Sequence, residues 1–189
     1  MNRAQQKLGE PNDFIRAKVK SSLDSVSQEF ICNAPFAVMA TSNATGDCDA
    51  SPKGGHPGFI KVLDPTSLLI PDFSGNKLFQ SYENIEGNPK LGLIFMIPGC
   101  GLTVRVNGQV RVIEKDELHG TADFLDLFSP DEQKEIQQAL LLSVDEAYPH
   151  CPRAFAFSNL WDTETIEQNL TSRSEKYWFK KWAEQYPTV

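Results

Sequence analysis

The chain has 189 residues, of which 40% are hydrophobic and 23% are charged, and its formal net charge is −7. This composition is ordinary for a folded protein and predicts a sizeable hydrophobic core rather than a disordered chain. The negative charge and the lack of any cluster of Lys and Arg argue against a protein that binds the phosphate backbone of nucleic acids.

The sequence also argues against a membrane protein, a metal-binding protein and a protein stabilised by disulfides. No apolar run approaches the length of a membrane span, and the first residues lack the apolar region of a signal peptide, so we expect a cytoplasmic protein. The four cysteines are widely spaced without a C-x-x-C pair, which predicts free thiols. The three histidines have no metal-ligand spacing, so no metal site is expected.

The first predicted element is a helix over about residues 12–31. Apolar residues recur there at helical spacing, at Ile15, Val19, Leu23, Val26 and Phe30. A hairpin comes next, because the apolar run 36–41 ends in a polar, glycine-containing turn and residues 48–51 can return beside it. We expect the helix to be a packing element and the hairpin to open a β-sheet.

The hairpin leads directly into a candidate anion-binding segment. Ser51, Pro52 and Lys53 follow the return strand, and Gly54 and Gly55 would let the backbone approach a ligand closely. A phosphate dianion needs about two cations for neutralisation, and Lys53 is a candidate for one of them. The alternative is a mobile surface lysine in a glycine-rich turn.

Residues 59–63 predict a third strand and residues 66–71 a fourth, which should stop at Pro71 because proline donates no ladder hydrogen bond. A turn over residues 72–76 would then lead into a helix that starts at Lys77, with Asn76 as its N-cap. The free N–H groups at such a helix start, beside the Lys77 ammonium, would form an anion site. The alternative is an ordinary connection with a solvated lysine.

The strongest β pattern lies in residues 91–96 and 102–112. In the second segment polar Thr103 and Arg105 alternate with Val104 and Val106, as expected when one face is buried and the other meets solvent or a ligand. Arg105 fits a ligand site and the outer surface of a barrel equally well.

The last third of the chain is predicted to be helical. Residues 116–128 and 130–140 show helical periodicity, with Ser129 as a cap for the second helix. Residues 173–186 predict an aromatic helix that docks on the body of the protein or on a partner chain.

The order of these motifs resembles the flavin-binding core of the pyridoxamine 5′-phosphate oxidase-like split-barrel family. In that family an S-R-K turn holds the phosphate of FMN, and a short helix, an N-P-x-x-x-L-x-F strand and an x-V-R-V-x-G strand follow. Residues 74–77, Ser-Gly-Asn-Lys, are similar to that turn with Asn76 in place of the arginine. Residues 49–59 and 70–72 resemble a subgroup of FMN-dependent enzymes without an assigned substrate. The resemblance covers about residues 36–113.

The chain also departs from the best-known family members. Pyridoxamine phosphate oxidases carry an R-x-V-L-L-K strand that contacts FMN and substrate, whereas residues 55–61 read Gly-His-Pro-Gly-Phe-Ile-Lys and lack that arginine. Lys61 is a candidate for the family's substrate lysine, although a shift of one residue would turn its side chain to the other face. Oxidation of pyridoxamine phosphate is therefore not expected.

The resemblance implies a β-rich α+β fold, an antiparallel split β-barrel with peripheral helices. It implies one domain over residues 1–189, with a barrel core at about 35–114 and a helical part at about 115–189. It further implies a homodimer with FMN at the subunit interface, acting as an oxidoreductase on an unidentified small molecule. The alternatives are a non-catalytic barrel that binds a flavin, a deazaflavin or haem, and a hydrolase-like or purely structural barrel in which the two lysines are incidental.

The same resemblance implies which residues bind FMN. The expected contacts are Ser51, Pro52, Lys53, Ile70, Pro71, Asp72, Asn76, Lys77, Thr103 and Arg105. Thr103 matches by position a glutamine of the family that hydrogen-bonds the flavin. Secondary candidates near the flavin are His150, Cys151, Arg153 and Trp161.

Overall fold

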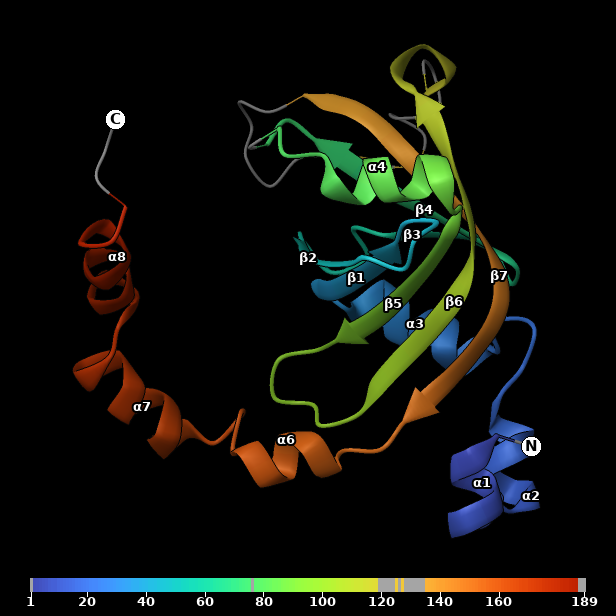
Figure 1. The fold of residues 1–189 in the computed structure, drawn as a ribbon, viewed down its shortest axis with the longest axis horizontal. Helices are drawn as coiled ribbons and strands as arrows, with labels where there is room; N and C mark the ends of the chain where they lie inside the picture. The colour runs from blue at the N-terminus through green and yellow to red at the C-terminus, as the bar shows by residue number, and fades with distance from the viewer. Residues whose placement is uncertain (1, 76, 119–124, 126, 128–134, 187–189) are drawn as a thin grey trace. The chain divides into compact units, whose positions relative to one another are not determined.

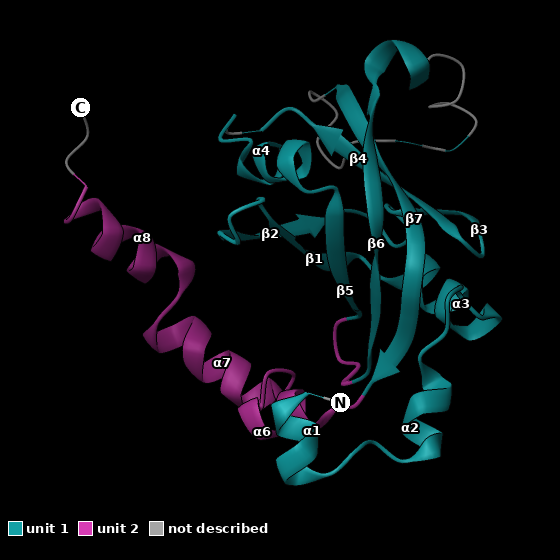
Figure 2. Cartoon of the chain, turned by 45° about the vertical axis from the view of Figure 1, so that its right-hand side comes forward, with its two compact units in different colours: residues 1–97, 102–150 teal, residues 98–101, 151–189 magenta. Residues whose placement is uncertain are grey.

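The computed structural model describes residues 2–75, 77–118, 125, 127 and 135–186 of the chain. The chain forms two compact units, drawn in different colours in Figure 2. Unit 1 holds residues 1–97 and 102–150, and unit 2 holds residues 98–101 and 151–189. The single domain expected from the sequence stays a prediction.

A seven-stranded antiparallel sheet forms most of unit 1, with its strands in the order β2-β1-β5-β6-β7-β4-β3 (Figure 1). The predicted hairpin is confirmed, because β1 pairs with β2 from Phe36 opposite Gly54 to Ser42 opposite Cys48. The strands predicted over residues 91–96 and 102–112 are confirmed as β5 and β6. The strands are β1 (Phe36–Ser42), β2 (Cys48–Gly54), β3 (Lys61–Asp64), β4 (Ser67–Phe73), β5 (Lys90–Met96), β6 (Thr103–Glu114) and β7 (Ile136–His150).

The sheet buries one face of β5 and both faces of β4. On β5, Leu91, Leu93 and Phe95 are buried and alternate with more exposed residues, as the period of a strand requires. On β4, Leu69 and Ile70 are both buried but belong to different core clusters. Packing on two sides fixes β4 in place, and with it the polar residues at its C-terminal end.

The prediction that the fourth strand stops at Pro71 is wrong, because β4 continues to Phe73. Pro71 lies opposite Ala139 of β7, whereas pairing with β3 on the other side reaches no further than Leu69 opposite Lys61. β4 is therefore an edge on its β3 side at Pro71, and proline is tolerated at such a position. The extension carries Asp72 into the strand.

The single N-terminal helix predicted over residues 12–31 is also wrong. The structure has two helices there, α2 (Asp13–Lys18) and α3 (Ser25–Asn33), preceded by α1 (Arg3–Leu8). Between them the backbone of Lys20 pairs with Ala147 of β7, with N–O distances of 3.1 and 2.7 Å. A strand-like pairing is incompatible with a continuing helix, so this tertiary contact overrides the helical periodicity.

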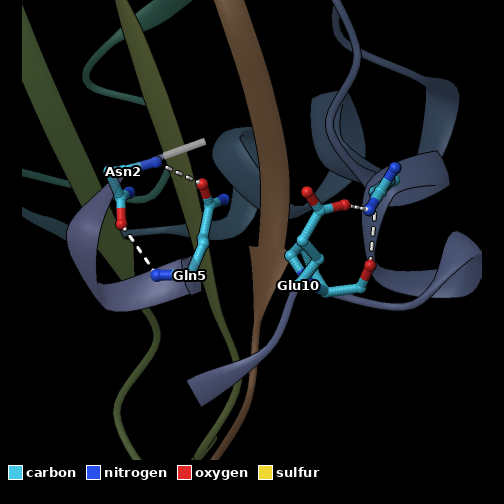
Figure 3. A network of polar contacts seen from close by, with 5 residues as sticks. Asn2, Gln5 and Glu10 are labelled. Carbon is cyan, nitrogen blue, oxygen red and sulfur yellow. Dashed lines mark hydrogen bonds and ion pairs between the residues drawn. The ribbon is translucent and has the colours of Figure 1, made fainter. Parts of the chain in front are cut away.

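The helices in the N-terminal segment begin at residues whose side chains accept hydrogen bonds from backbone N–H groups. Figure 3 shows the capping box of α1, in which Asn2 Oδ1 accepts from the Gln5 N–H and Gln5 Oε1 accepts from the Asn2 N–H, both at 3.0 Å. The same figure shows Glu10, whose carboxylate pairs with Arg16 of α2. Asp24 caps α3 by accepting a hydrogen bond from the Ser27 N–H at 2.8 Å.

We expect Asp24→Ala to lower the free energy of unfolding by about 1 kcal/mol at neutral pH, because α3 loses its N-cap. The Ser27 N–H holds the pKa of Asp24 below the ordinary value of 3.8. Because the pKa is lower in the folded state, the carboxylate stabilises the protein at pH values above its unfolded pKa. This contribution is lost as the pH falls through the folded pKa. Urea unfolding at pH 7 and pH 3 measures the difference. Asp24→Asn, which preserves the cap, should resemble the unmodified protein at pH 7; equal loss in both variants would contradict the capping role.

The prediction of a helix over residues 130–140 is wrong for residues 136–140, the part that the structure describes as a strand. The expectation that residues 115–189 are helical throughout is wrong for the same reason. Ile136–His150 is the long strand β7, which pairs with β6 along one edge and with β4 along the other. Ala139, Leu140 and Leu142 are buried in the sheet. Pairing on both edges outweighs the local helical pattern. Of the helix predicted over 116–128, Lys115–Leu118 form a 3₁₀ helix, η1, and most of the remainder lies outside the described residues.

The described residues of unit 2 form three helices, α6 (Arg153–Ser158), α7 (Thr163–Ser172) and α8 (Glu175–Ala183). The aromatic helix predicted over residues 173–186 is confirmed as α8, with narrower limits. Trp161 donates its Nε1–H to the Cys100 carbonyl oxygen at 3.0 Å and stacks on Phe155, with 5.8 Å between ring centroids. Within the part of the chain that the structure describes, no helix is long and apolar enough to cross a membrane.

Candidate functional site

A cavity of about 410 Å³ in unit 1 lies between β2, the end of β4 and the start of α4 (Gln80–Gly87). It brings together residues that are far apart in the sequence. From the predicted site it is lined by Ser51, Pro52, Lys53, Asp72 and Lys77. Half of the expected FMN contacts therefore share one cavity.

Strand β2 supplies the first wall of this cavity. Lys53 pairs with Ala37 and Ser51 pairs with Met39, and both β1 partners are fully buried. Paired residues in an antiparallel sheet point to the same face, so the Lys53 and Ser51 side chains lie on the inner face of the sheet. Lys53 is partly exposed there, and it forms no ion pair with any described residue.

The segment before α4 supplies the second wall. The predicted helix start at Lys77 is wrong, because α4 begins at Gln80 with Phe79 in the N-cap position. Lys77 and Phe79 have φ angles of 62° and 50°, in the left-handed region that non-glycine residues adopt at a cost of about 1 kcal/mol or more. Asn76, the predicted cap, lies outside the described residues. Strained backbone at the edge of a cavity is typical of a ligand site.

The start of α4 brings backbone N–H groups without a described partner to the lining of the cavity. Phe79 provides no side-chain cap, and the N–H groups of Gln80 and Ser81 have no hydrogen-bond partner among the described residues. Both residues line the cavity, as does Lys77, which makes no ion pair with a described residue. Uncapped N–H groups and the positive end of the helix favour an anion at this position.

Asp49, Ser81 and Tyr82 are among the cavity residues that were not predicted from the sequence. Asp49 accepts a hydrogen bond from the Ser81 hydroxyl, with 2.5 Å between the oxygens. Tyr82 lies beside Asp72, and burial, followed by the charge of the Asp72 carboxylate, raises the pKa of the phenol well above its usual value. Alternation along β2 could have identified Asp49, two residues from Ser51. Ser81 and Tyr82 had no such signal because the helix start was predicted three residues too early.

The other expected contacts lie away from this cavity. Ile70 is 1% exposed in the core and Pro71 is buried beside it. Thr103 and Arg105 lie on the opposite face of the sheet from Lys53, because Lys53, Ala37, Phe95 and Val104 form one row across the strands. Lys61 on β3 does not line the cavity.

Arg105 has a buried polar atom without a partner. Its Nε makes no hydrogen bond within the described residues, although the guanidinium lies 5.4 Å from the centre of the Tyr148 ring. In unit 2, Arg153 lies 5.4 Å from the ring centre of Phe157. Cys151 is an exposed free thiol.

A second cavity of unit 1, of about 510 Å³, offers a different set of groups. Its lysine, Lys90, is paired with Asp145 at 2.8 Å, and its lining includes small residues such as Ala40 and Gly92. Because this ammonium is already neutralised, the cavity beside Lys53 is the better candidate for an anionic ligand.

The sequence profile of the family described as Pyridoxamine 5′-phosphate oxidase matches residues 23–151, more than half of the chain. The chain belongs to this family. The match spans the complete sheet of unit 1 and the cavity residues from Asp49 to Tyr82. No curated protein matches the sequence.

Solved structures support the fold of this pyridoxamine 5′-phosphate oxidase family member. A variant of HupZ from Group A Streptococcus is 17% identical, with a TM-score of 0.51 over 68% of this chain and 99% of the other. A candidate pyridoxamine 5′-phosphate oxidase from Lactobacillus delbrueckii is 23% identical, with a TM-score of 0.51 over 68% of this chain and 95% of the other. The β-rich α+β split-barrel fold predicted from the sequence is confirmed.

Proposed function

We propose that the protein binds FMN non-covalently in the cavity between β2 and α4 and acts as an FMN-dependent oxidoreductase on a small molecule. The observation that carries this proposal is the placement of Lys53 and Lys77, both without an ion-pair partner among the described residues, at one cavity of about 410 Å³. Membership of the family supports a flavin as the ligand.

The cavity residues fit the phosphate of FMN. A phosphate ester carries close to two negative charges at neutral pH, and two ammonium groups can neutralise it. The unpaired N–H groups of Gln80 and Ser81 add backbone donors at the positive end of α4. The cavity volume also lies within the range of small-molecule sites.

A homodimer with FMN at the subunit interface is part of this proposal. Thr103 and Arg105 lie on the opposite face of the sheet from Lys53, so they are poorly placed to hold the same ligand within one chain. The buried Arg105 Nε lacks an acceptor among the described residues. A second copy of the chain that presents its Thr103 and Arg105 to the cavity of the first would bring these residues to the same ligand as Lys53.

Bound FMN would supply the redox chemistry, as flavins carry hydride or electron pairs between substrates. The chain's own residues would hold the phosphate through Lys53 and Lys77 and orient the rest of the ligand along β2. Since the arginine of the R-x-V-L-L-K pattern is absent, the substrate we infer is a small molecule other than pyridoxamine phosphate.

The visible spectrum of the purified protein tests this function. We expect flavin absorption bands, or saturable binding when FMN is added, with one FMN per chain, and bleaching of the bands by a chemical reductant. A protein that binds haem or a deazaflavin and not FMN would support the non-catalytic alternative. A protein that binds none of these ligands would contradict the proposal.

A further inference from the structure

The cavity that holds the two lysines also contains two carboxylates. Asp49 on β2 and Asp72 on β4 line it from two different strands. With Lys53 and Lys77 the formal charges of these four groups cancel. A cavity built only for phosphate would gain nothing from acidic groups, so the carboxylates need a separate physical reason.

Neighbouring side chains hold both carboxylates in place. The Ser81 hydroxyl donates to Asp49 Oδ2 at 2.5 Å, and Ser81 is only 7% exposed. Gln138 Nε2 lies 3.4 Å from Asp72 Oδ2, and the phenol of Tyr82 lies beside the same carboxylate. Each carboxylate has about four acceptor positions, so the one or two donors among the described residues leave further positions available to a ligand.

These open acceptors are suited to hydroxyl groups. A carboxylate accepts hydrogen bonds from hydroxyls strongly, and it repels a second phosphate. Lysines beside carboxylates therefore match a ligand with one compact anion and several hydroxyl groups next to it. Polyphosphates and ligands with several carboxylates match this arrangement less well.

We propose that Asp49 and Asp72 bind the hydroxyl groups of a sugar-alcohol chain whose terminal phosphate is held by Lys53 and Lys77. This inference rests on the proposed FMN site and assigns its ribityl subsite.

Removing the charge of either carboxylate changes the affinity for FMN in opposite directions, depending on whether the carboxylate binds a hydroxyl group or only lies near the phosphate. Asp49→Asn and Asp72→Asn preserve shape but weaken a charge-assisted hydrogen bond to a hydroxyl. We expect each variant to bind FMN about tenfold less tightly, the factor that corresponds to about 1.4 kcal/mol. If the carboxylates only repel the phosphate, both substitutions would instead raise the affinity for FMN, and that result would overturn the inference.

Riboflavin, which has the ribityl chain without the phosphate, provides a second readout by the same fluorescence titration. Asp72→Asn should weaken riboflavin binding as much as FMN binding, whereas Lys53→Ala should weaken only FMN binding. Asp64→Asn, at the end of β3 and outside the cavity, is the matched control. Unchanged riboflavin affinity in both asparagine variants would overturn the subsite assignment.

The outcomes separate this inference from the proposed function. A wild-type protein that binds neither FMN nor riboflavin contradicts the flavin site itself, and the subsite with it. A wild-type protein that binds FMN, together with asparagine variants that bind it equally well or better, overturns only the ribityl subsite. Circular dichroism of each variant confirms that the sheet is intact before the affinities are compared.

Discussion

Replacing Lys53 and Lys77 together by alanine is expected to lower the affinity for FMN by about a hundredfold or more. A hydrogen bond to a charged group contributes about 1.5–3 kcal/mol, and about 1.4 kcal/mol corresponds to a factor of ten. Neither ammonium group forms an ion pair with a described residue, so their removal breaks no ion pair within the described part of the chain. Titration of flavin fluorescence for the double and the two single variants measures the effect.

The charge dependence of this result can be tested independently. Wild-type affinity should fall as the ionic strength rises, and the double variant should show a much weaker salt dependence. Lys61→Ala is the matched control, because Lys61 is a lysine of the same sheet that does not line the cavity. Equal losses for Lys61→Ala and Lys53→Ala, or an unchanged affinity in the double variant, would contradict the phosphate site.

The second large effect is expected for Gly108→Ala, which should lower the free energy of unfolding by about 3 kcal/mol or more. A β-carbon at Gly108 would overlap the backbone carbonyl oxygen of Ser143 on β7. The pairing of β6 with β7 changes register between Asn107 and Gly108, so the two backbones approach closely at this irregularity. The overlapping atom is a backbone oxygen that is held in place by the pairing of β6 with β7, so no side-chain rotation can relieve the overlap.

Gly54→Ala is the control for a glycine-to-alanine change in a strand. A β-carbon there would lie 3.6 Å from the Pro35 carbonyl oxygen, an ordinary contact, so stability should change by less than about 1 kcal/mol. Urea unfolding followed by circular dichroism compares both variants with the unmodified protein. A similar small effect at both positions would show that β6 and β7 do not approach each other as closely as the structure indicates.

Local patterns in the sequence were sufficient to predict several strands. The run at residues 36–41 and the alternation of Thr103 and Arg105 with Val104 and Val106 identified β1 and β6. These patterns are reliable because burial of one face of a sheet imposes a period of two on the chain itself. Lys53 and Lys77 were predicted as phosphate ligands from their position beside a hairpin and a strand-turn-helix segment together with the family resemblance, and both line one cavity.

Other elements could not be read from local patterns. β7 has a helix-like distribution of apolar residues, and only its pairing with both β6 and β4 makes it a strand. Pro71 is the usual signal for a strand end, yet β4 continues to Phe73 because its pairing with β7 extends past the proline. In each case the deciding hydrogen bonds connect segments that are far apart in the sequence.

The sequence by itself determined the family, the antiparallel sheet and the two lysines that the proposal assigns to phosphate, because each is encoded within a short stretch of chain. Only the tertiary structure decided that Asp49 meets Ser81 and that Tyr82 lies beside Asp72. It also placed Arg105 on the opposite face of the sheet from Lys53. The physical reason is that these relations depend on strand register and on the start of α4, which hydrogen bonds and packing between distant segments fix.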